Sequence, residues 1–219
     1  MAVVKRIVCL ANSRKKRGFC VAGRELLATG VGPWLRPVSD RESEEVSPQE
    51  QAYQNGKSPQ LLDVIDIPLI EPRPKGHQTE NWLLDPQKRW QYAGKMRWED
   101  LNGLAENPVE LWVNGQSTNA GLNDRMRPED AANLRGSLYL LHLDNLDLRV
   151  FVYFRRRIHA IFTHHGISYS IAVTDPAFES KYYAGENGIF PLGECFVTIS
   201  LGEPYEGYCY KLVAGIFPK

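Results

Sequence analysis

Hydrophobic positions along the chain fall into many short runs, a pattern that favours β-strands over long helices. Residues 7–10 and 19–22 are apolar and partly β-branched or aromatic, with Gly18 between them. They predict two strands joined by a turn at residues 12–17. Residues 24–27 predict one helical turn, and residues 61–70 predict the clearest strand of this half. Short helices are expected near residues 47–51, 98–104 and 127–134.

The C-terminal half reads mostly as β-strands. The expected strands are residues 138–143, 146–154, 158–162, 168–173, 195–201 and 208–216, with a turn at residues 144–145. A helix is expected from Pro176 to Tyr183, because Asp175 is a good N-cap and proline is favoured at the first helical position. This half therefore has strands first, then one helix, then two more strands. A five-stranded OB barrel has the same order of elements.

This pattern predicts a mainly β protein with short helices, built from two tandem OB-like small β-barrels packed together. We expect an N-terminal OB-like domain with long loops at residues 1–134 and a C-terminal OB-like domain at residues 135–219. Many short strands without a long helix fit barrels better than a parallel α/β sheet.

Composition indicates an ordinary globular protein. The chain has 219 residues, 43% of them hydrophobic and 24% charged, and a formal net charge of zero. No apolar run approaches the roughly 18 residues that span a bilayer. We therefore expect a cytoplasmic protein without a membrane partner. The four cysteines lie within apolar runs and form no CxxC pair, so they predict core side chains rather than a zinc site or a disulfide framework.

Charge is distributed unevenly along the chain. Residues 3–41 contain nine basic and two acidic side chains, whereas residues 42–66 contain six acidic side chains and Lys57. Cations held close together by a hairpin repel one another unless acidic side chains or an anionic ligand offset the repulsion. The sequence leaves both explanations open: an anion-binding patch, or internal pairing of the basic segment with the acidic one.

Several stretches resemble one bacterial family, the dual OB-containing domain. They are residues 5–15 (KRIVCLANSRK), 18–25 (GFCVAGRE), 34–39 (WLRPVS), 78–81 (QTEN), 121–125 (GLNDR), 173–176 (VTDP) and 201–212 (LGEPYEGYCYKL). The resemblance runs from end to end of the chain. It implies two tandem OB-type barrels, a bacterial conflict or defence setting, and recognition of a nucleic acid or nucleotide. It brings no catalytic or ligand-binding residues with it.

The first functional hypothesis is a non-catalytic module that binds or senses single-stranded nucleic acid or a nucleotide. OB barrels bind single strands with a basic groove and aromatic platforms. Arg155, Arg156 and Arg157 offer further cations, and Phe151, Tyr153 and Tyr210 further platforms, although a single aromatic is more often buried. The predicted binding residues are Asn12, Ser13, Arg14, Lys15, Lys16, Arg17, Trp34, Arg36, Gln78, Glu80, Asn81, Asn123, Arg125, Asp175, Tyr208 and Lys211.

Two alternatives remain open at this point. One is an enzyme acting on a phosphoester or nucleotide, with His77, Gln78, Glu80, Asn81, Asp124, Asp175, Glu179 and Glu203 as its polar residues. No known catalytic motif appears, so we rank the enzyme below the binding module and expect no metal and no cofactor. The other is a protein-interaction subunit working beside an effector protein. It would use edges near Pro37 and Pro68, or the loop at residues 112–127.

Overall fold

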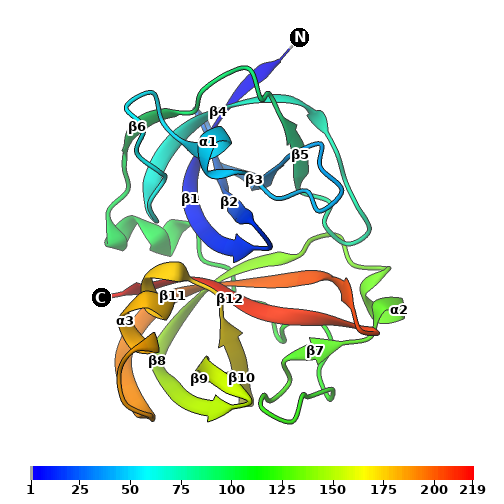
Figure 1. Cartoon of the computed structure of the whole chain (residues 1–219), viewed down its shortest axis with the longest axis vertical. Coiled ribbons are helices and arrows are strands. Elements are labelled where there is room, and N and C mark those ends of the chain that lie inside the picture. The colour runs from blue at the N-terminus through cyan, green and yellow to red at the C-terminus, as the bar shows by residue number, and fades with distance from the viewer. Residues whose placement is uncertain (1) are drawn as a thin grey trace. The chain divides into compact units, whose positions relative to one another are not determined.

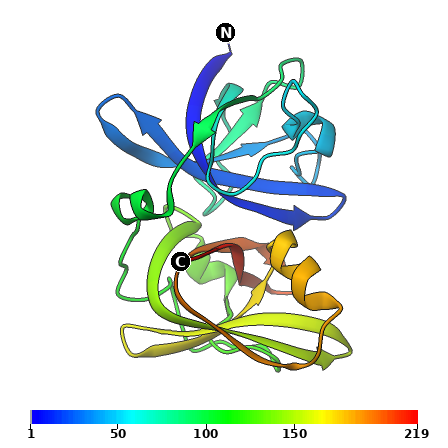
Figure 2. The ribbon, with the colours of Figure 1, turned by 90° about the vertical axis from the view of Figure 1, so that its left-hand side faces the viewer.

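The computed structural model describes residues 2–219 and divides into two compact units, the first ending at Leu104 and the second beginning at Ala105 (Figures 1 and 2). The sequence placed this boundary later, after residue 134. Residues 105–134 belong to the second unit because Leu111, Trp112 and Met126 are buried in its core. The two-residue strand β7 (Arg125–Met126) also pairs there with β12 (Tyr208–Pro218).

The first unit is a closed barrel with one added strand. Its elements are β1 (Val3–Lys15), β2 (Gly18–Leu27), β3 (Gly30–Val38), α1 (Pro48–Gln51), β4 (Asp63–Pro72), β5 (Asn81–Leu84), β6 (Gln91–Lys95) and the 3₁₀ helix η1 (Trp98–Gly103). The ring follows the order β1-β2-β3-β5-β4 and closes through pairing of β4 with β1. β3 and β5 run parallel, and β6 extends the sheet beside β4.

The second unit repeats this arrangement. Its elements are β7, α2 (Pro128–Ala131), β8 (Leu138–Tyr153), β9 (Arg155–His164), β10 (Ile167–Val173), α3 (Pro176–Tyr183), β11 (Gly188–Tyr205) and β12. The ring follows the order β8-β9-β10-β12-β11 and closes through β8 and β11. Its third and fifth strands, β10 and β12, are again parallel, and its helix again lies between the third and fourth strands. Both units therefore have the OB arrangement, which confirms the predicted fold class.

Each barrel encloses its own hydrophobic core. Ile7, Val21, Leu35 and Trp90 are among the side chains buried in the first barrel. Leu148, Tyr169, Val197 and Ile216 are among those buried in the second. Cys9, Cys195 and Cys209 are buried in these cores as expected, and Cys20 is half-buried.

Local capping signals predicted two helices well. Ser47 and Glu50 form a capping box at the start of α1, each side chain accepting a hydrogen bond from the other residue's backbone N–H. Asp175 accepts a hydrogen bond from the backbone N–H of Ala177 at 2.9 Å and caps α3, which ends at Tyr183 as predicted. These signals act within a few residues, so the sequence alone contains them.

Pairing with distant strands overturned three local expectations. Residues 24–27 continue β2 instead of forming a helical turn, because β1 pairs on one side and β3 on the other. Pairing of Lys15 with Gly18 also shortens the predicted turn at residues 12–17 to Lys16 and Arg17. Asp144 and Asn145 do not reverse the chain: β8 runs through them, opposite register shifts of β11 around Gly193, which has a φ of 71°.

The two prolines expected at open strand edges lie in paired positions of the first ring. Pro37 pairs with Trp82 of the parallel strand β5, and Pro68 pairs with Val4 of β1. Each of these two residues therefore has a partner strand within the barrel on at least one side.

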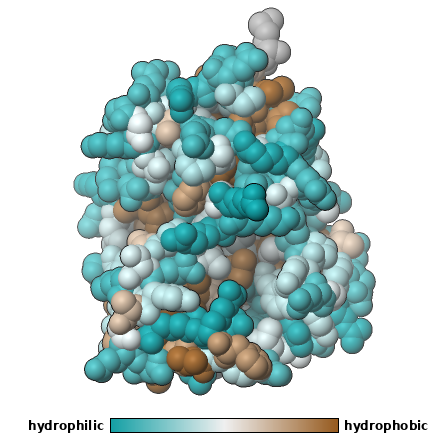
Figure 3. Space-filling view, viewed as in Figure 1, coloured by the Kyte–Doolittle hydropathy of each residue, from teal (hydrophilic) through white to brown (hydrophobic). Residues whose placement is uncertain are grey.

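Hydrophilic side chains cover most of the face shown in Figure 3, with smaller hydrophobic areas between them. Within residues 2–219, no helix is long and apolar enough to cross a membrane.

Gly23 provides a test of the close approach of β1 and β2 in the first barrel. A methyl group at this position would lie 1.9 Å from the backbone oxygen of Val8, on the neighbouring strand. We expect Gly23→Ala to lower the free energy of unfolding by about 3 kcal/mol. The measurement is urea unfolding followed by tryptophan fluorescence, since Trp34, Trp82 and Trp90 lie in this unit.

Gly103→Ala is the matched control, because a methyl group there meets nothing within 4 Å. Equal stability of the two variants would contradict the tight approach of β1 and β2 at Gly23.

Candidate nucleic-acid interface

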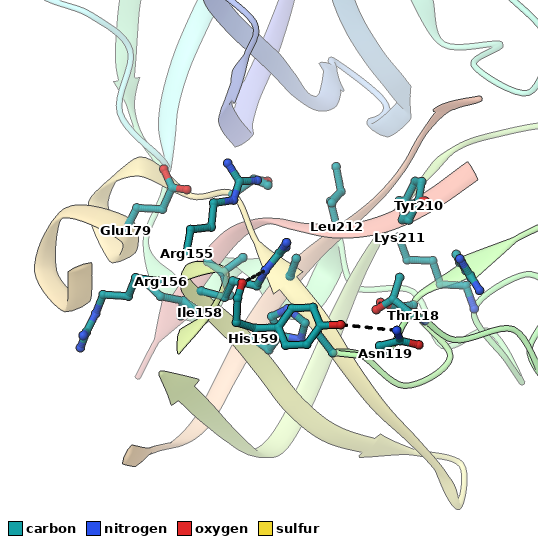
Figure 4. A pocket seen from close by; sticks show the side chains of 18 of the residues that line it. Thr118, Asn119, Arg155, Arg156, Ile158, His159, Glu179, Tyr210, Lys211 and Leu212 are labelled. Carbon is teal, nitrogen blue, oxygen red and sulfur yellow. Dashed lines mark hydrogen bonds between the residues drawn. The ribbon is translucent and has the colours of Figure 1, made fainter. Parts of the chain in front are cut away.

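The second barrel contains a cavity of about 730 Å³ (Figure 4). Its walls come from the end of β8, the start of β9, the end of β10, the β11–β12 connection, the first half of β12, α3, and β7 with the loop that precedes it. The lining residues are Thr118, Asn119, Ala120, Asp124, Arg125, Tyr153, Arg155, Arg156, Arg157, Ile158, His159, Ala172, Val173, Thr174, Glu179, Tyr183, Tyr205, Glu206, Tyr210, Lys211 and Leu212.

Three consecutive arginines open β9 and supply most of the cavity's positive charge. Arg156 donates hydrogen bonds to the backbone oxygens of Tyr182, at 3.3 Å, and Gly185, and so ties β9 to the end of α3. Arg157 donates from Nε to the Tyr153 backbone oxygen at 3.4 Å. Arg155 is exposed, and its side chain leaves the strand in a different direction from that of Arg156 (Figure 4).

None of these three arginines forms an ion pair with a carboxylate anywhere in residues 2–219. The cavity walls carry five cations in total, including Arg125 and Lys211, against three acidic residues, Asp124, Glu179 and Glu206. A surface of this composition attracts anions, and its arginines can form bidentate contacts with phosphate oxygens.

Tyrosines line the same space. The Tyr153 hydroxyl accepts a hydrogen bond from Asn119 Nδ2 at 3.4 Å (Figure 4). Tyr205 and Tyr183 are 64% and 54% exposed. The pKa of Tyr205 is raised because its hydroxyl hydrogen-bonds to Glu206. Exposed aromatic rings beside arginines are the combination with which proteins hold single-stranded nucleic acid.

Two titratable groups in the wall are almost fully buried. Lys211 Nζ donates to the Val113 backbone oxygen at 2.9 Å and to Asn114 Oδ1 at 2.8 Å, and burial lowers its pKa to about 8. His159 Nδ1 lies 3.2 Å from Ser170 Oγ, and burial lowers its pKa to about 4. His159 is therefore neutral at physiological pH.

Asp124 holds the loop that forms one wall. Its carboxylate accepts hydrogen bonds from Thr118 N at 2.7 Å and from Thr118 Oγ1 at 2.6 Å. Its backbone oxygen accepts a hydrogen bond from Lys211 N at 2.8 Å. A methyl group on Gly121 would lie 2.0 Å from the carboxylate, so this close approach requires glycine. The wall is thus fixed to β12.

The predicted residues of the second barrel separate into two groups. Arg125 and Lys211 line the cavity, and the Arg125 guanidinium lies 3.8 Å from the ring centre of Tyr208. Asn123 instead holds its own loop, accepting from Gly115 N and donating to the Ser168 backbone oxygen. Asp175 caps α3 and accepts from Ile216 N at 3.2 Å, and burial raises its pKa.

The predicted cationic hairpin of the first barrel has a different setting. Arg14, Lys16 and Arg17 are exposed at its end, whereas Ser13 is buried and Asn12 donates to the Pro59 backbone oxygen. The positive charge of Lys15 contributes to a lowered pKa of Glu45, after the larger effect of the Ser43 hydroxyl. The acidic segment thus partly offsets the basic one.

Further along the first barrel, the predicted residues are occupied by neighbouring side chains. Arg36 is 2% exposed, lies 3.1 Å from the Glu80 carboxylate and donates to Asn81 Oδ1 at 3.4 Å. Asn81 in turn donates to Gln78 Oε1 at 3.4 Å. Trp34 lies under the Arg24 guanidinium, 5.8 Å away. Arg36, Gln78, Glu80 and Asn81 do converge, but in the interior.

Several cavity residues were outside the predicted set. The sequence indicates Arg155, Arg156, Arg157 and Tyr153 only as further cations and platforms, and it does not indicate Tyr183, Tyr205 or His159 as binding residues. The usable signal was topological: residues 153–157 span the connection between the first two strands of the second barrel. OB folds bind oligonucleotides with this loop, the loop between strands four and five, and the face of strands two and three.

Among the described residues 2–219, no group of three or more histidine, cysteine, aspartate or glutamate side chains is arranged to hold a metal ion.

Lys211 predicts a pH dependence of stability. Its pKa falls from 10.5 to about 8 on folding, so the folded state disfavours the charged amine. The contribution of the neutral Lys211 amine to the free energy of unfolding is fully present above pH 10.5 and is lost as pH falls through about 8. Relative to Lys211→Met, the wild-type free energy of unfolding should therefore rise by about 3 kcal/mol across this window.

The measurement is urea unfolding of both proteins at several pH values between 7.5 and 10.5, followed by circular dichroism. A constant difference between the two proteins would contradict the lowered pKa.

Comparison with known proteins agrees with the barrel topology. A family model described as the dual OB-containing domain matches residues 5–216. Comparisons with curated proteins and with solved structures gave no match. Because the matched region covers nearly the entire chain, the protein belongs to the dual OB-containing domain family.

Proposed function

We propose that this protein binds single-stranded nucleic acid without catalysis, and that the second-barrel cavity makes the main contact. The observation that carries the proposal is where the cavity lies in the fold. Its walls include the start of β9, the end of β10, the two residues that flank the β8–β9 connection (Tyr153 and Arg155), and Glu206 of the β11–β12 connection. In an OB fold, strands two and three and these two connections form the ligand-binding face and loops.

The chemistry of the walls supports the same ligand. Arg155, Arg156 and Arg157 all line the cavity, and none has an ion pair with a carboxylate among residues 2–219. A phosphate backbone neutralises such groups and releases its counterions, which favours binding at low salt. The exposed rings of Tyr183 and Tyr205 offer apolar surface to bases.

The first barrel contributes a weaker contact in this proposal. Its β1–β2 turn, Lys16 and Arg17, has the same topological position as the β8–β9 connection of the second barrel. Both side chains are exposed, so the turn offers two cations to a phosphate backbone. The buried Arg36–Glu80 pair is assigned a structural role, because truncating either partner would leave a buried charge.

A nucleotide is the second candidate ligand. The cavity volume of about 730 Å³ lies within the 300–1,000 Å³ range typical of small-molecule sites. If the cavity is a site for one nucleotide, a mononucleotide should bind as tightly as a longer strand. If it is a site for a strand, affinity should rise with the length of the strand.

Family membership supports an OB module. The defence setting and an effector protein working beside this one are proposals from the family resemblance.

Charge reversal at Arg155 tests the main contact. Arg155→Glu should weaken binding of a fluorescein-labelled 15-nucleotide single strand by about tenfold or more, because a phosphate-binding cation becomes repulsive. The slope of log affinity against log salt should lose about 0.7 for each phosphate contact removed. Fluorescence anisotropy between 50 and 300 mM salt measures both quantities.

Arg135→Glu is the matched control, since Arg135 is an exposed arginine of the same unit outside the cavity. Equal losses in the two variants would mean that the effect comes from net charge alone and would contradict the cavity as the contact.

Charge reversal in the first barrel measures how much that barrel contributes to binding of the strand. The double variant Lys16→Glu, Arg17→Glu should weaken the same strand by less than Arg155→Glu does, because these side chains stand at a turn outside the cavity. The reverse order of effects, in the same anisotropy assay, would move the main site to the first barrel.

A further inference from the structure

The connection between β8 and β9 is a single residue, Phe154. Its side chain is 94% exposed, and its backbone has a φ of 58°. Both properties are unfavourable for phenylalanine: a bulky residue rarely adopts positive φ, and an exposed aromatic ring forgoes burial. A glycine or asparagine would fit this conformation better.

Some other aromatic rings of this barrel are covered by arginine side chains, whereas Phe154 is not. The Arg125 guanidinium lies 3.8 Å from the centre of Tyr208, and that of Arg149 lies 4.5 Å from the centre of Phe151. Tyr153 lies beside Arg157 and packs edge-to-face against Phe154 at 4.8 Å. Tyr153 is therefore the aromatic neighbour of Phe154, and most of the Phe154 ring stays open to solvent.

Charge around Phe154 identifies the kind of ligand. The next residue, Arg155, lines the cavity and has no ion pair within the described part of the chain. An apolar ring and a free cation on adjacent residues match one nucleotide unit, which has an aromatic base and an anionic phosphate. A purely apolar partner would leave Arg155 without a counterpart.

We propose that Phe154 stacks on a base of the bound strand while Arg155 holds a neighbouring phosphate. This inference rests on the proposed function and names the residue that recognises a base. Stacking on a protruding ring requires an unstacked base, so the contact favours a single strand over a duplex. It is tolerant of sequence, because every base has a π-face.

A strand without bases separates stacking from charge. Phe154→Ala should bind a 15-nucleotide oligothymidine about tenfold more weakly than wild type, with an unchanged salt slope. On an abasic strand of equal length, which has the same phosphates, Phe154→Ala and wild type should bind alike. Phe154→Trp should retain affinity for oligothymidine. Arg155→Glu should weaken binding of both strands.

Each contrary result has a distinct meaning. If Phe154→Ala binds oligothymidine normally while Arg155→Glu does not, the stacking inference fails and the proposed function stands. If Phe154→Ala weakens both strands equally, the residue acts on loop structure and the inference also fails. If wild type binds neither strand but binds anionic lipid vesicles through Phe154, both proposals are overturned.

Discussion

Closure of each sheet into a ring is the constraint on which the rest of the structure depends. In both units the third and fifth strands pair in parallel, β3 with β5 and β10 with β12, while the first and fourth strands pair antiparallel. This closure satisfies the backbone hydrogen-bonding groups along the ring and encloses a core. It also brings Tyr153 and Arg155, which flank the β8–β9 connection, and the distant Glu206 of the β11–β12 connection to one cavity.

Given the same topology, charge distinguishes the two barrels. In the first, cations are largely paired internally: Lys5 lies 2.8 Å from Glu25, Arg6 lies 2.7 Å from Asp66, and the buried Arg36 pairs with Glu80. In the second, the arginines that open β9 line a cavity, where Arg156 and Arg157 donate hydrogen bonds to backbone oxygens and Arg155 is exposed. A net charge of zero for the whole chain therefore conceals a cavity whose walls carry more cations than carboxylates.

Local signals were readable from the sequence, whereas long-range pairings were not. The N-cap at Asp175 located α3, and the order of strands and helix indicated OB barrels. Asp144 suggested a turn because aspartate is common in turns. The β11 register shift opposite this part of β8 depends on residues far away in the sequence, so a local pattern does not reveal it. Arg36 resembled an anion ligand because its partner, Glu80, is distant in sequence. The sequence did not indicate Phe154 as a binding residue, because only the structure shows that it is exposed at a strand connection.

Photocrosslinking tests the central claim most directly, because it maps the contact without altering the protein. A 15-nucleotide single strand containing 4-thiothymidine would be irradiated with the full chain, and the crosslinked peptides identified by mass spectrometry. The account predicts crosslinks within residues 153–157 and 205–212, the two connections that bound the cavity. Crosslinks confined to the first barrel, or none above those of a duplex control, would contradict it.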